Sequence, residues 1–114
     1  MSDRELLELA AKAAGIDYKH DNWDWKHEDH CAFWDYDDLC TCGARWNPRD
    51  DDGDALRLAV KLGLTVAQLI TSREVYVFNH EETVEVYEDY GTDPDAATRQ
   101  AIVRAAAEIG RNMT

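Results

Sequence analysis

The residues best suited to binding a metal lie in one segment, residues 19–42. It holds three of the four histidines and all three cysteines of the chain. Zinc prefers about four Cys and His ligands in a tetrahedron. The spacing here, C-x-C and H-x-x-H-C, differs from the paired C-x-x-C of a zinc finger or zinc ribbon. The leading hypothesis is therefore a protein without a cofactor. The alternative is a small zinc-binding accessory or regulatory module. The candidate ligands are His27, His30, Cys31, Cys40 and Cys42.

No group of residues in the sequence has the spacing of a catalytic site. A Cys–His pair can activate a thiolate in principle, but nothing in the spacing within residues 19–42 supports one. A convergent acid, base and nucleophile are also missing from the rest of the pattern. The sequence therefore predicts a protein that is not an enzyme.

Aromatic and acidic residues alternate within residues 19–42. Alternation suits a strand that buries its aromatic face. It equally suits an exposed contact surface, because aromatic residues are enriched at interface hot spots. The candidates for partner binding in this segment are Trp23, Trp25, Trp34, Asp35, Tyr36, Asp37 and Asp38.

A second acidic group lies towards the C-terminus, where no Lys or Arg occurs between Asn79 and Ala97. Carboxylates lined along a strand and its loop could imitate the phosphates of a duplex. They could also keep an edge strand from pairing with another chain. The candidates for partner binding here are Glu81, Glu82, Glu85 and Glu88.

The formal net charge of −12 is large for this chain of 114 residues. It argues against nucleic acid and anionic membranes as direct partners, because binding to phosphates depends on Lys and Arg. It favours a basic protein surface as the partner, although acidity can also serve solubility alone. No apolar run approaches the roughly 18 residues of a membrane span, and the N-terminus lacks the pattern of a signal peptide. An intracellular location is therefore expected.

Four aspartates surround Gly53 in residues 50–54, the acidic turn, and suggest a calcium loop. The EF-hand loop also needs a Glu that closes a twelve-residue loop, and no acidic residue follows in the helix expected next. The carboxylates of Asp50, Asp51 and Asp52 are plausible N-caps of that helix and suit its dipole. Gly63 is expected to end it.

Three helices are predicted from apolar residues that recur every three or four positions. The first covers residues 2–14, the second follows the acidic turn, and the third begins with Asp93 as N-cap and Pro94 at N1. The predicted buried residues are Leu6, Leu9, Ala10 and Ala13 in the first helix, Leu56, Ala59 and Val60 in the second, and Ala97, Ala101, Ile102, Ala105 and Ile109 in the third.

Strands are predicted over residues 64–70, 75–78 and 83–88, which form an antiparallel meander. Shorter strands are predicted near residues 16–18 and 43–46. The expected fold is α+β, an antiparallel sheet of about four or five short strands packed with three helices, in the order α-β-β-α-β-β-β-α. Residues 1–114 form one domain with an inserted loop at about 19–42.

Three blocks of the sequence resemble small phage and prophage proteins with a phage ABA-sandwich domain. They are residues 4–15, residues 96–108, and Trp46-Asn47-Pro48 with Asp51-Asp52-Gly53-Asp54-Ala55-Leu56-Arg57-Leu58-Ala59-Val60-Lys61-Leu62, which is the most specific block. Together they cover about half of the chain. The resemblance implies a bacteriophage accessory protein with a layered α/β/α fold, and it implies no site residues because the family has no established activity. Residues 19–42 depart from the family, whose members usually have a shorter strand pair there.

Charge, size and resemblance lead to one functional hypothesis. The protein is expected to be a phage-encoded, non-enzymatic inhibitor of a bacterial antiviral defence system, of the anti-CRISPR type. Its acidic surfaces would bind the basic nucleic-acid groove of a CRISPR–Cas or other defence complex in the cytoplasm of the bacterial host.

Overall fold

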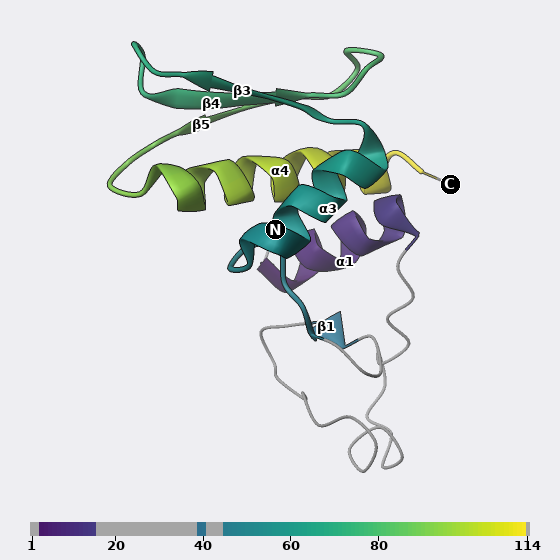
Figure 1. Cartoon of the computed structure of the whole chain (residues 1–114). Coiled ribbons are helices and arrows are strands. Elements are labelled where there is room, and N and C mark those ends of the chain that lie inside the picture. The colour runs from purple at the N-terminus through teal and green to yellow at the C-terminus, as the bar shows by residue number, and fades with distance from the viewer. Residues whose placement is uncertain (1–2, 16–38, 41–44, 114) are drawn as a thin grey trace.

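The computed structural model describes residues 3–15, 39–40 and 45–113. These residues form an α+β fold with three helices and a three-stranded antiparallel sheet, which confirms the predicted class. Figure 1 shows the sheet as the upper layer, α4 (Pro94–Arg111) directly beneath it, and α1 (Asp3–Ala14) beneath α4. The remaining helix, α3 (Asp52–Leu62), lies beside α4. Within the described residues, no helix is long and apolar enough to cross a membrane.

The sheet is the predicted meander of β3 (Thr65–Leu69), β4 (Glu74–Phe78) and β5 (Glu85–Asp89), in that order. The described part of the sheet holds three strands and not the predicted four or five, and the strand predicted near residues 16–18 lies outside the described residues. Two strands of two residues each, β1 (Leu39–Cys40) and β2 (Arg45–Trp46), pair with one another and do not join it. The elements that build the layers therefore follow the order α-α-β-β-β-α.

α4 is the central element of the core, because it contacts both the sheet and α1. The predicted one-sided stripe was too narrow for a helix with neighbours on two sides. Most of the buried residues of α4 are small, which lets both neighbours approach its backbone closely. They are Ala97, Ala101, Ile102, Val103, Ala105, Ala106, Ala107 and Gly110, whereas the predicted Ile109 is only partly buried.

The buried faces of the two other helices differ from the prediction by one position. In α1, Leu7 is fully buried while Leu6 is partly exposed. In α3, Leu58 is buried, whereas Leu56 and Val60 are 65% and 72% exposed. Each helix carries two overlapping apolar stripes, and the position of α4 decides which one is buried.

Both ends of α3 form as the sequence predicts. Asp51 is the N-cap, and its carboxylate accepts a hydrogen bond from the backbone N–H of Asp54 at 2.9 Å. Gly63 closes the helix with φ of 63°, a left-handed conformation that glycine adopts without steric cost. The carboxylate of Asp54 is itself buried and accepts bonds from the backbone N–H of Asn47 at 3.0 Å and from Arg57 at 2.7 Å. The acidic turn therefore holds the start of this helix together.

Candidate functional site

The sheet has one face against α4 and one face that points away from all three helices (Figure 1). Val75 and Val77 are fully buried towards α4. Because side chains alternate along a strand, the residues between and beside these valines lie on the opposite face. We call this side the outer face. The pairing of β4 with β5 gives it six central residues, which are Glu74, Tyr76, Phe78, Glu85, Tyr87 and Asp89.

Three aromatic rings stack across the outer face. The ring of Tyr76 lies 4.4 Å from that of Tyr87, with only 12° between the ring planes. The ring centroid of Tyr76 also lies 4.8 Å from that of Phe78, with 29° between the ring planes. Tyr87 remains 53% exposed. The stack is an ordered apolar surface that is partly open to solvent, and aromatic groups of this kind dominate the energetics of many interfaces.

Carboxylates border the aromatic stack. The hydroxyl of Tyr76 donates a hydrogen bond to Oε1 of Glu85 at 2.9 Å, and this bond is the main reason why the pKa of Tyr76 rises to about 12. The charge of Glu82 raises the same pKa further, which places it within electrostatic reach of the stack. Glu74 and Asp89 face one another across β4 and β5 at the far end of the group.

The four glutamates predicted to bind a partner do not form one patch. Glu85 lies on the outer face, and Glu81 and Glu82 are exposed in the turn before β5. Glu88 has the opposite orientation and forms an ion pair with Arg104 of α4. Successive residues along β5 alternate between its two faces, so Glu88 lies on the other side of the strand from Glu85, and its role in partner binding stays a prediction.

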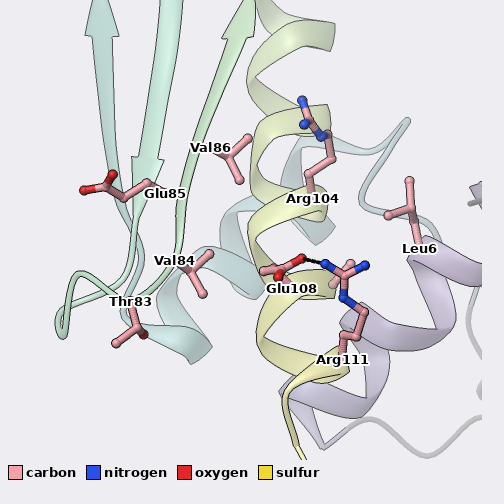
Figure 2. A pocket seen from close by; sticks show the side chains of 9 residues that line it. Leu6, Thr83, Val84, Glu85, Val86, Arg104, Glu108 and Arg111 are labelled. Atoms are coloured by element: carbon pink, nitrogen blue, oxygen red, sulfur yellow. Dashed lines mark hydrogen bonds and ion pairs between the residues drawn. The ribbon is translucent and has the colours of Figure 1, made fainter.

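Figure 2 shows the opposite side of β5, where Val84 and Val86 point towards α4 and Glu85 points away. A pocket of about 380 Å³ lies here between β5, α4 and Leu6 of α1. Its two cationic groups already have acidic partners. Arg111 bonds to Glu108 at 2.5 Å, and Arg104 pairs with Glu88. An anionic ligand would have to displace both carboxylates, so this pocket is a poor anion site.

The candidates between residues 19 and 42 lie outside the described residues, with one exception. Cys40 is part of β1, and the zinc hypothesis stays a prediction. In the part of the chain that the structure describes, no three His, Cys, Asp or Glu side chains are placed to hold a metal ion. The residues outside the description are Trp23, Trp25, His27, His30, Cys31, Trp34, Asp35, Tyr36, Asp37, Asp38 and Cys42.

Sequence reasoning missed the aromatic part of the outer face. The signal was present, because Tyr76 and Phe78 alternate with valines in β4 and Tyr87 alternates with Val86 and Glu88 in β5. Only the strand register shows that these aromatic rings meet across two strands.

No protein-family model, curated protein or solved structure matches this chain.

Proposed function

We propose that this protein is a phage-encoded, non-enzymatic inhibitor of a bacterial antiviral defence system, and that it binds a basic, nucleic-acid-binding surface of a defence complex. The observation that carries the binding proposal is the outer face, an ordered aromatic stack bordered by carboxylates. The phage origin, the ABA-sandwich membership and the bacterial cytoplasm as the place of action are supported by the resemblance of the three sequence blocks.

Arginine is the residue that the outer face suits best. A guanidinium group can stack on the exposed ring of Tyr87 while its N–H groups donate to the nearby carboxylates. Glu85 is already oriented by its bond from Tyr76, so little side-chain entropy is lost when it accepts a second donor. Nucleic-acid grooves are rich in arginine and lysine, because these residues neutralise phosphates.

The net charge of −12 supplies the long-range part of the interaction. A strongly negative protein approaches a basic groove faster than a neutral one, and this advantage falls as salt increases. The protein would then occupy the site of the nucleic acid and exclude it. The acidic and aromatic residues between positions 23 and 38 would extend the contact in this proposal.

The test is affinity capture from the lysate of a phage-sensitive bacterium with the tagged full chain. The proposal expects one nucleic-acid-handling defence complex to be recovered and then released by its own DNA or RNA or by high salt. The double variant Tyr87→Ala with Glu85→Gln should weaken recovery at least about tenfold, the effect of losing a stacked, hydrogen-bonded anchor. Glu108→Gln is the matched control, because it removes one negative charge from α4 and leaves the outer face intact.

Two results would overturn the proposal. One is that no nucleic-acid-handling complex is recovered. The other is that the complex is recovered equally by the double variant and by the control, in which case the outer face does not bind it. Circular dichroism of each variant shows whether the fold is retained.

A further inference from the structure

The strand β3 forms one edge of the sheet, with β4 on one side. On its other side, no described strand pairs with it and no backbone group of another described element bonds to it; the carbonyl of Leu69 accepts a bond from the hydroxyl of Ser72 at 3.4 Å. An edge strand with free N–H and C=O groups is a template for pairing with another chain, and proteins usually protect such edges with charges, prolines or bulges.

The edge at β3 lacks the charges that protect β5 at the opposite edge. Residues 62–72 contain no Asp, Glu, Lys or Arg, in a chain of which 32% is charged. This uncharged run includes the whole of β3. By contrast, β5 carries Glu85, Glu88 and Asp89 within five residues. Two copies of an acidic chain can therefore approach one another at β3 without bringing carboxylates of the two strands together.

The position of β3 is fixed by its side-chain bonds to the core. Gln68 donates to the hydroxyl of Thr98 in α4 at 3.0 Å and accepts a bond from the hydroxyl of Tyr90 at 2.5 Å. The edge is thus formed in the single chain, and a pairing strand would not have to order it first.

Apolar side chains adjoin the same edge. An open groove of about 350 Å³ lies below β3, between α3 and α4. Val66 of β3 and Leu56 of α3 line its apolar part, and the charged residues that also line it are Asp52, Asp95 and Arg99. Leu56, Val60 of the same helix and Ile70 at the end of β3 are each at least 65% exposed. In a charged, acidic protein these side chains lie in solvent at a cost of roughly 1 kcal/mol or more each.

We propose that β3 pairs with β3 of a second copy of this chain and joins the two sheets into one of six strands. A two-fold axis perpendicular to the sheet makes the two β3 strands antiparallel and keeps both outer faces on the same side. The helical layers then also share one side, so that α3 of each copy lies next to the joined edge and can cover Leu56 and Val60. This dimer would form whether or not the outer face binds a basic partner.

A second copy fits this edge better than a basic partner does. A basic strand would find no carboxylates at this edge with which to form ion pairs. Two copies of β3 instead present the same uncharged residues to one another, which are Thr, Val, Ala, Gln and Leu. Paired uncharged strands also avoid close contacts between carboxylates, so the repulsion between two chains of net charge −12 acts only over longer distances, where salt screens it.

The test is the mass of the purified full chain by sedimentation equilibrium over a range of concentrations. The proposal expects twice the chain mass of 13.0 kDa, with reversible dissociation on dilution. Ala67→Lys places a charge at the centre of β3 and opposite the same charge of the second copy, so it should raise the dimer dissociation constant at least about tenfold. Thr92→Lys, which adds the same charge in the exposed turn after β5, is the matched control, and its mass should equal that of the wild type.

Amide hydrogen exchange gives a second measurement. In the dimer, the N–H groups of β3 that point away from β4 become protected, and this protection should disappear on dilution. If Ala67→Lys fails to fold, Thr65→Lys at the exposed end of the strand replaces it. A wild-type chain that stays at 13.0 kDa at every concentration, or an Ala67→Lys variant that dimerises like the wild type, overturns the proposal.

Discussion

Gly110 offers the sharpest test of the helix packing, because α1 crosses α4 directly against it. A Cβ atom added at Gly110 would lie 2.0 Å from the carbonyl oxygen of Leu9 and 2.8 Å from its carbonyl carbon. Both are backbone atoms of α1, so no side-chain rotation can make room. We predict that Gly110→Ala destabilises the protein by forcing α1 away from α4.

Two opposing effects set the magnitude. Alanine is favoured over glycine inside a helix by up to about 1 kcal/mol. Overpacking a well-packed core costs about 1–3 kcal/mol, and the rigid backbone neighbour places this site at the upper end. The helices must separate by roughly 1 Å to restore ordinary contacts. The separation loosens the burial of Leu7, Ala10 and Ala11 at this interface, so a net loss of about 2 kcal/mol is expected.

Urea unfolding followed by circular dichroism measures this loss. With an m-value of about 1–3 kcal/mol/M, the midpoint should fall by about 1 M. Gly53→Ala in α3 is the matched control. Its added Cβ would meet side-chain atoms only, the capping carboxylate of Asp51 at 3.1 Å and the end of Arg57 at 3.2 Å, and each needs to shift by only a few tenths of an ångström. Its stability should change by less than about 1 kcal/mol.

The outcome distinguishes two failures of the reasoning. If Gly110→Ala unfolds at or above the wild-type midpoint, then α1 does not contact α4 at this glycine and the layer order is wrong. If the m-value falls together with the midpoint, then α1 has separated from the cooperative unit, and the loss measures its detachment.

The remaining predictions concern single contacts. Because the pKa of Tyr76 is raised to about 12 by its bond to Glu85, this bond stabilises the fold fully below the ordinary tyrosine pKa of 10.0, and the stabilisation is lost as pH rises from 10.0 towards 12. Absorbance titration at alkaline pH should show a late-titrating tyrosine that returns to its ordinary range in Glu85→Gln, and an unchanged titration would refute the bond. Asp54→Ala leaves the buried backbone N–H of Asn47 without its acceptor, so the free energy of unfolding should fall by about 2 kcal/mol. The control is Asp95→Ala on the exposed first turn of α4, which should change the free energy of unfolding by less than about 1 kcal/mol. Arg99 makes two bonds, from Nε to the carbonyl of Arg49 and from Nη1 to Asp52, and Arg99→Lys removes one of them, which should cost about 1 kcal/mol. The same change at Arg104, whose side chain is 45% exposed against 17% for Arg99, should cost less than about 0.5 kcal/mol. Equal effects at the two arginines would show that the bond to the Arg49 carbonyl contributes nothing.

Local chemistry was sufficient to predict the ends of the elements and their types. Helix α3 begins after its N-cap Asp51 and ends at Gly63, and α4 begins with Asp93 and Pro94. These ends could be predicted because caps depend on side chains and dihedral angles within a few residues. The three strands and their meander follow from β-branched and aromatic residues separated by short turns. These features led to the α+β class correctly.

The sequence predicted the acidic half of the candidate site more completely than the aromatic half. Glu81, Glu82 and Glu85 are exposed as expected. The stack of Tyr76, Phe78 and Tyr87 was not predicted, because the rings belong to two strands and meet only through the register between them.

Tertiary structure decided which side of each element is buried. Leu6 and Leu7 of α1 are equally apolar, as are Leu56 and Leu58 of α3, and a helix alone has no reason to bury one rather than the other. α4 makes the choice because it lies between the sheet and α1 and takes contacts on both sides. The same helix turns Val75 and Val77 inward and leaves Tyr76 outside. The sequence by itself determined the local elements and the acidic character of the chain, whereas the outer face exists only because the helices all pack on one side of the sheet.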